Sequence, residues 1–247
     1  YGGTRYYRDH VVHVFRVWLL GIRLLLNKEN KLLEQISIDD KCETNALEKL
    51  AMWTFIALTH DLGYPLEKAQ QIIGKTRDMM TSFVANPIIS MDLSFSGIQN
   101  SMNDFVLRFM SSKMVQKQMP DNDQFKFVAR LQPKYLFKFQ KSLERNSHGI
   151  LSALVIYKLL RYFLESDYCT NEDYYFKEED ARQFYIRREI LRAISSHTCH
   201  DIYHMDYKNF SFLLILCDDA QEWGRKYITE LYVNSPLKYT FNGIHVT

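Results

Sequence analysis

Apolar residues recur at three- and four-residue spacing along nearly the whole chain, and residues that favour turns are scarce. The first such stretch includes Val11, Val14, Trp18 and Leu25. This spacing places apolar side chains on one face of an α-helix. Only nine glycines and five prolines occur in 247 residues, whereas a β-sandwich or barrel needs a turn every few residues. The sequence therefore predicts an all-α helical bundle.

The pattern defines one helical domain, residues 1–231, followed by a short C-terminal tail, residues 232–247. Asn45 and Glu48 have the spacing of a capping box, which predicts the start of a helix. In the tail, the Asn-Gly pair at Asn242 separates two short β-prone segments and is typical of a small hairpin. The predicted helices cover roughly 11–26, 45–62, 66–84, 98–117, 133–145, 148–165, 179–197 and 207–231.

The composition is that of a folded, nearly neutral protein. Its 31 basic and 29 acidic residues leave a net charge of +2, and 47% of its residues are apolar, which argues against disorder and against a basic nucleic-acid-binding tail.

The apolar runs are shorter than the roughly 20 residues of a membrane span. The four cysteines lie far apart, which favours reduced thiols in a cytoplasmic protein. The chain starts at Tyr1 rather than at a methionine, which predicts a fragment of a longer protein.

Two segments concentrate charge of opposite sign. Residues 130–145 carry five basic residues against one acidic residue, a net charge of +4, and residues 165–180 carry seven acidic residues against one basic residue, a net charge of −6. The acidic segment is typical of an exposed loop. Four cations of the basic segment fall at helical spacing, among them Lys141 and Arg145. This stripe either borders a cleft, where it would attract a phosphate ester, or is a solvated helix face.

His60 and Asp61 form the most informative pair. They follow residues 51–59, which are uncharged and mostly apolar, so the end of this helix is buried or faces a cleft. Adjacent residues lie about 100° apart on a helix, so the imidazole and the carboxylate can converge on one metal ion, and the carboxylate can bridge two. A buried charge without such a partner would be costly. The alternative is that the two residues only cap helix ends.

Further histidines and one aspartate lie in or at the ends of predicted apolar helices, where random surface histidines would not gather so consistently. These residues are His10, His13, His148, His197 and Asp218. Asp219 is an alternative to Asp218 as a ligand, and His200 and His204 are alternatives to His197.

In this order along the chain, these residues resemble the motifs of the HD-domain superfamily of metal-dependent phosphohydrolases. The resemblance runs from about His10 to Arg225, and it implies an all-α, HD-domain helical bundle. His60-Asp61-Leu62-Gly63 resembles the motif that names the family. The other similar motifs are His13 with Arg16-Val17, His148-Gly149-Ile150-Leu151-Ser152-Ala153, His197 at the end of an Ala-Ile-containing helix, and Asp218 in Leu216-Cys217-Asp218-Asp219-Ala220.

The resemblance implies a centre of one or two divalent transition-metal ions (Fe, Mn, Zn or Ni), which suit mixed imidazole and carboxylate ligands. One ion would be bound by His13, His60, Asp61 and Asp218, and a second by Asp61, His148 and His197, with Asp61 bridging the two. The expected catalytic residues are Asp61 and His10, with His10 as a proton donor beside the ligands or, alternatively, a helix-surface residue. The expected substrate-binding residues are Arg16, Lys141, Arg145 and His200.

The function implied by this resemblance is hydrolysis of a small-molecule phosphate ester or nucleotide by a metal-activated water, so no serine or cysteine nucleophile is required. Tyr64 follows Gly63 where cyclic-dinucleotide phosphodiesterases of the family typically have lysine, so we do not expect that substrate.

A mixed-valent diiron oxygenase on the same scaffold is one alternative, and a non-catalytic nucleotide-binding signalling module is another. We expect neither membrane nor nucleic acid as a partner. A homo-oligomer and additional domains in the full-length chain remain open.

Overall fold

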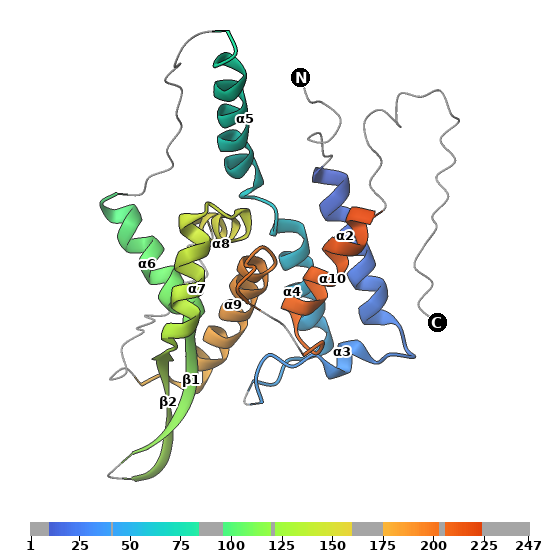
Figure 1. Ribbon diagram of the computed structural model, residues 1–247. Coiled ribbons are helices and arrows are strands. Elements are labelled where there is room, and N and C mark those ends of the chain that lie inside the picture. Colours follow the sequence, from blue (N-terminus) through green and yellow to red (C-terminus); the bar gives the residue numbers. More distant parts are fainter. Residues whose placement is uncertain are drawn as a thin grey trace.

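The computed structural model describes residues 10–40, 42–83, 96–119, 122–159, 175–202 and 206–223, and these are mostly helical (Figure 1). The prediction of a mainly α-helical fold is therefore confirmed. In chain order the elements are α2 (His10–Leu26), α3 (Leu32–Gln35), α4 (Ala46–Thr59), α5 (Tyr64–Met80), α6 (Ile98–Ser111), β1 (Ser112–Met119), β2 (Asn122–Leu131), α7 (Pro133–Glu144), α8 (His148–Leu159), α9 (Glu178–Ser196) and α10 (Phe210–Trp223).

Helices α2, α4 and α10 pack against one another in one part of the bundle (Figure 1). Trp53 of α4 is fully buried, and its indole N–H donates to the carbonyl oxygen of Trp18 in α2 at 3.0 Å. The two helices approach closely because α2 has Gly21 opposite this ring. A Cβ atom at Gly21 would lie 2.0 Å from the Trp53 ring. This contact fixes α2 against the helix that ends at His60.

Helix α9 joins this part to the rest of the bundle. It packs against α4 and α10 on one side and against α6 and α8 on the other. Phe184 of α9 contacts Phe109 of α6 edge-on, with 4.7 Å between ring centroids, and both rings are buried. Ala193 and Ile194, at the end of α9 where His197 lies, belong to the same buried core.

Local sequence signals explain where several helices begin. Asn45 and Glu48 form the predicted capping box, in which each side chain accepts the other residue's backbone N–H at 2.9 Å. Pro65 and Pro133 lie in the first turns of α5 and α7, where a missing backbone N–H leaves no intrahelical hydrogen bond unmade. These helices begin within about two residues of their predicted starts, a margin typical of helix ends.

The prediction of a helix over residues 98–117 is wrong beyond Ser111, because the chain continues there as strand β1. This strand pairs antiparallel with β2 to form a two-stranded hairpin that extends away from the helices (Figure 1). Lys113 is exposed and Met114 is buried, which is the alternation of a strand with one covered face. The segment is too short for its periodicity to distinguish a strand from the continuation of a helix.

Within the described ranges, none of the helices has the length and apolar character needed to cross a membrane. Cys42, Cys199 and Cys217 are buried free thiols, as the sequence predicted. The fourth cysteine, Cys169, lies outside the described residues, and so does the hairpin predicted at 232–247.

Candidate metal centre

Asp61 lies at the middle of a cluster of histidines. Helix α4 ends at Thr59 and His60 is its C-cap, so both members of the pair leave the helix where other helices converge. The His60 side chain is fully buried and that of Asp61 is 10% exposed. Three imidazole Nε2 atoms surround Asp61 Oδ1, those of His148 at 3.3 Å, His60 at 3.6 Å and His197 at 3.8 Å.

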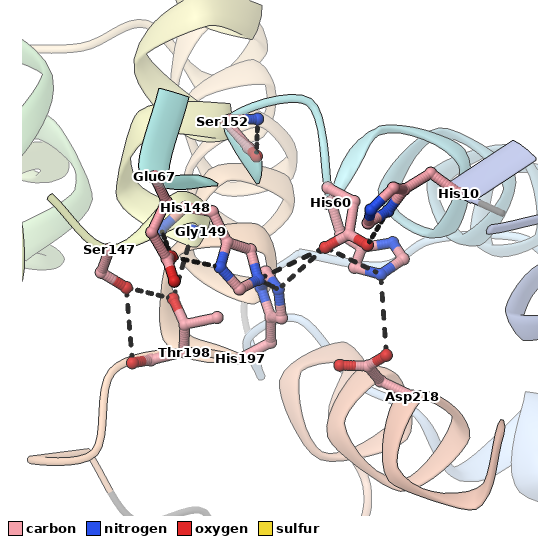
Figure 2. Close-up of polar contacts among 12 residues, drawn as sticks. His10, His60, Glu67, Ser147, His148, Gly149, Ser152, His197, Thr198 and Asp218 are labelled. Atoms are coloured by element: carbon pink, nitrogen blue, oxygen red, sulfur yellow. Dashed lines mark hydrogen bonds and ion pairs between the residues drawn. The ribbon is translucent and has the colours of Figure 1, made fainter. Parts of the chain in front are cut away.

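Helices α2 and α10 close one side of this cluster. His13 Nε2 lies 2.9 Å from Asp218 Oδ1 and 3.7 Å from Asp61 Oδ2. His60 Nε2 lies 3.9 Å from the same Asp218 oxygen, and Figure 2 shows that carboxylate directed at the histidines. The register of α10 thus brings Asp218, rather than its rival Asp219, into contact with the cluster.

Helices α8 and α9 close the other side. His148 is the first residue of α8 and His197 is the C-cap of α9, and the two helices pack together. Their rings point toward each other in Figure 2, with 3.2 Å between the two Nε2 atoms. The structure therefore brings these two residues together beside Asp61.

The cluster divides into overlapping groups whose ligand atoms lie within 4.8 Å of one another, a spacing that could hold a metal ion. These groups are His13 with His60 and Asp61, His60 with His197 and Asp218, and Asp61 with His148 and His197. We call the space between His13, His60, Asp61 and Asp218 position 1, and the space between Asp61, His148 and His197 position 2. Asp61 belongs to both, because Oδ2 faces His13 while Oδ1 faces His148 and His197.

Hydrogen bonds on the far ring nitrogens orient two of these histidines. His60 Nδ1–H donates to the carbonyl oxygen of Ala57 at 2.8 Å, and His197 Nδ1–H donates to that of Ile194 at 2.5 Å. A carbonyl oxygen can only accept, so the proton is on Nδ1 and Nε2 of the neutral ring is a bare acceptor. The buried Nε2 of His60 has no hydrogen-bond partner in the described part of the chain.

Acceptor atoms therefore face one another inside the bundle. His60 Nε2 and Asp61 Oδ1 are 3.6 Å apart, and burial lowers the pKa of His60 to about 4, so this ring is neutral at pH 7. A buried polar atom without a partner is costly. A cation between the two atoms would satisfy both, and imidazole nitrogen with carboxylate oxygen is a ligand set that suits transition metals.

The carboxylates make the cluster electronegative. Burial alone would raise the pKa of Asp61, but hydrogen bonds from neighbouring imidazoles, that of His10 foremost, hold it well below its ordinary value. Burial alone would lower the pKa of His148, but its contacts with Asp61 and Glu67 outweigh burial and raise it to about 9. The field that draws a proton to His148 would equally favour a divalent cation.

Two further residues contact the ligand set. His10 Nδ1 lies 3.2 Å from Asp61 Oδ2, and its 31% exposed side chain packs on Tyr64 with 4.0 Å between ring centroids. His10 therefore lies beside the ligands, as one of its two sequence interpretations required. The sequence patterns did not indicate Glu67 of α5 as part of the site. Its carboxylate accepts hydrogen bonds from the backbone N–H of His148 at 3.0 Å and from the ring Nδ1–H of His148 at 2.6 Å. An acidic residue in the first turn of a helix is common, because it suits the positive end of the helix dipole, so Glu67 carries no local signal of a contact with α8.

Two glycines allow α8 to approach its neighbours. A Cβ atom at Gly63 would lie 2.4 Å from the carbonyl oxygen of His148, and one at Gly149 would lie 2.5 Å from Thr198 Oγ1. Both backbone N–H groups are used in the same contacts, since Gly63 donates to Ser152 Oγ at 2.8 Å and Gly149 donates to Thr198 Oγ1 at 3.1 Å (Figure 2). These contacts fix the position of His148 relative to Asp61 and α9.

The basic stripe on α7 is held by an acidic partner. Lys141 Nζ and Arg145 Nη1 lie 3.2 and 3.6 Å from the carboxylate oxygens of Asp201. Asp201 is in the turn that follows α9, close in sequence to His197. The stripe therefore fastens this turn to α7, and part of its charge is already compensated.

The remaining expected substrate-binding residues do not join the ligand groups. Helix α9 ends at Ser196, so His200 lies exposed in the following turn, not on a continued helical face of His197. The predicted helix, 179–197, ends at the same place, and substrate binding by His200 stays a prediction. Arg16 is half-buried on α2, and His204 lies outside the described residues.

Comparisons with known proteins do not identify a relative. The chain matches no protein-family model, no curated protein and no solved structure. Its function is therefore inferred from the side chains of the cluster.

Proposed function

We propose that the protein is a metal-dependent phosphohydrolase of the HD-domain type, acting on a phosphate ester such as a nucleotide. The observation that carries this proposal is the placement of Asp61, whose two oxygens face histidines on opposite sides. A carboxylate so placed can bridge two ions. Further support comes from the ligand order along the chain, which resembles that of the HD-domain motifs.

Each position offers imidazole nitrogen together with carboxylate oxygen. In this proposal the residues of position 1 would hold one divalent ion and those of position 2 a second, and Fe, Mn, Zn or Ni would suit these ligands. Such a pair supplies an activated water and stabilises charge on the phosphoryl oxygens. The chain's own contribution is to fix the ligands in a largely water-excluded site, which strengthens every charge interaction there.

His10 is the group that we assign to proton transfer. An alkoxide leaving from phosphorus needs a proton, and a histidine beside the reacting centre is well suited to provide one. The contact of its Nδ1 with Asp61 Oδ2 holds the ring at the cluster, while its partial exposure keeps it accessible to an ester entering from solvent. Tyr64, which packs on the ring, restricts its orientation.

A mixed-valent diiron oxygenase is the rival enzyme, because a similar set of histidines and aspartates on the same scaffold serves that chemistry. Metal analysis combined with oxygen-uptake measurements separates the two. Two irons per chain with oxygen-dependent turnover would contradict the hydrolase. The third alternative, a non-catalytic nucleotide-binding module, is disfavoured because no expected ligand is missing from the cluster.

The test is phosphate release by the purified protein loaded with Mn²⁺, Fe²⁺ or Zn²⁺, measured on aryl phosphate mono- and diesters and a panel of nucleotides. Asp61→Ala is expected to abolish hydrolysis and metal binding while the circular dichroism of the helices is retained. The matched control is Asp104→Ala on α6, since the Asp104 carboxylate pairs with Arg108 at the surface. Metal retained at full occupancy in Asp61→Ala, or metal-loaded wild type that hydrolyses none of these esters, would overturn the proposal.

A further inference from the structure

Glu67 reaches from α5 to the beginning of α8. Its Oε2 atom accepts both the backbone N–H and the ring Nδ1–H of His148, at 3.0 and 2.6 Å, and Figure 2 shows the carboxylate against that residue. Its other oxygen accepts a hydrogen bond from Gln71 one turn further along α5, at 3.2 Å. The carboxylate is therefore held on both sides.

This contact determines which nitrogen of His148 is available to a metal. A carboxylate can only accept, so Nδ1 keeps a proton, and Nε2, directed at Asp61 Oδ1 and His197 Nε2 at 3.3 and 3.2 Å, is the nitrogen at which a metal ion would take the place of a proton. A carboxylate bonded to the far nitrogen of an imidazole also makes the near nitrogen a stronger metal ligand.

The other histidines of the cluster lack this support. The far nitrogens of His60 and His197 bond to neutral carbonyl oxygens. His13 Nδ1 is buried, and no described residue offers it a hydrogen bond. The two positions are therefore unequal, because only position 2 includes a histidine that is both oriented and polarised by a carboxylate.

We infer that Glu67 is a positioning residue that strengthens metal binding at position 2 by orienting and polarising His148. This inference rests on the proposed function in one respect only, namely that the cluster binds two divalent ions. Removal of such an outer carboxylate typically weakens metal binding by about 10- to 100-fold.

Glu67 also stabilises the beginning of α8, so the test must separate its charge from its hydrogen bonds. In Glu67→Gln the amide oxygen can still accept from the backbone and the ring of His148, but the negative charge is lost. Glu67→Ala loses both. Glu48→Gln is the matched control, because Glu48 also lies in the first turn of a helix and bonds its own cap and Arg182, away from the cluster.

The experiment is a titration of the metal-free protein with Co²⁺, followed by visible absorption, which reports ligation directly and requires no turnover. Wild type and Glu48→Gln are expected to bind two Co²⁺ in two steps of different affinity. Both Glu67 variants should weaken one step by about 10- to 100-fold and leave the other within about threefold of wild type. His13→Ala should remove that other step and retain the one that the Glu67 variants weaken.

Two results would overturn the inference while leaving the proposed function intact. In one, both Glu67 variants bind two Co²⁺ with wild-type affinities. In the other, His13→Ala removes the same step that the Glu67 variants weaken. Wild type that binds no Co²⁺ would overturn the proposed function together with the inference. Circular dichroism and thermal unfolding of each metal-free variant distinguish a lost ligand from a lost fold.

Discussion

At the scale of single residues, the ends of helices orient the ring nitrogens that could bind a metal ion. The last carbonyl oxygens of a helix have no backbone N–H partner in the helix. His60 and His197 are the C-caps of their helices, and each donates Nδ1–H to the carbonyl three residues earlier. This bond satisfies an unpaired helical carbonyl and turns Nε2 outward, so a histidine at such a place is oriented by its own helix.

Loss of His13 should affect one metal position and not the other. His13 contacts Asp218 and Asp61 on the position 1 side, whereas position 2 uses His148 and His197. We expect His13→Ala to lower the bound metal from two equivalents to one and phosphate release by at least 10-fold, since a lost ligand should cost no less than a lost outer carboxylate. Elemental analysis after desalting measures this. Two equivalents remaining in His13→Ala would contradict the assignment.

The residues of the candidate metal centre could be singled out in the sequence because each lies at an end or on a face of a strongly periodic helix. Glu67 could not be identified in this way, because its partner His148 is on another helix, and no local sequence pattern indicates that α5 and α8 meet. The role of Lys141 and Arg145 was unresolved for a similar reason. Their partner Asp201 follows α9, and only the packing of α7 places it beside them.

At the scale of helices, the centre depends on how closely α8 approaches the turn after α4. Gly63 lies in that turn, and the backbone of α8 occupies the place of a side chain there. The spacing of apolar residues predicted the helices, but it carries no information on such interhelical contacts. It also failed at β1, because a strand is stabilised by its partner strand as much as by its own sequence.

Gly63→Ala should therefore damage the site through packing. The added methyl group would meet the His148 carbonyl oxygen at 2.4 Å and the Ser152 nitrogen at 2.7 Å, both of them backbone atoms that cannot yield easily. We expect a loss of about 1–3 kcal/mol in the free energy of unfolding, measured by urea denaturation, and weaker Co²⁺ binding at position 2.

The matched control lies on α5 at Gly74, where an added Cβ has no neighbour within 4 Å. Gly74→Ala should raise the free energy of unfolding by about 0.5–1 kcal/mol, because alanine favours the helix interior. It should leave metal binding unchanged. Equal stability and metal affinity of Gly63→Ala and Gly74→Ala would show that the contact between Gly63 and α8 is unimportant.

At the scale of the whole molecule, the cluster connects helices from both ends of the described chain. Its ligands come from α2 and α10, from the turn after α4, and from α8 and α9. A ligand that binds only the folded state stabilises it by mass action, about 2.7 kcal/mol at a free concentration of 100 times its Kd. A bound metal would thus hold together helices that are otherwise joined by side-chain packing.

Removal of metal should accordingly lower the melting temperature. With a shift of about 2–4 °C per kcal/mol for a chain of this size, a chelator is expected to lower Tm by about 5–10 °C, measured by differential scanning calorimetry. Restoring Mn²⁺ should reverse the change. The Tm of Asp61→Ala should not respond to the chelator, and an equal response there would locate the stabilising metal elsewhere.

The contact between His13 and Asp218 also has a consequence for biosynthesis. At about 5–20 residues per second, a ribosome takes roughly 10–40 s to proceed from one codon to the other. Near the end of that time the emerging chain carries seven of its eight histidines but still lacks a complete α10, so position 1 stays incomplete. On the proposed function, hydrolysis would begin only after α10 has left the exit tunnel, and a nascent chain could not act on the nucleotides around it.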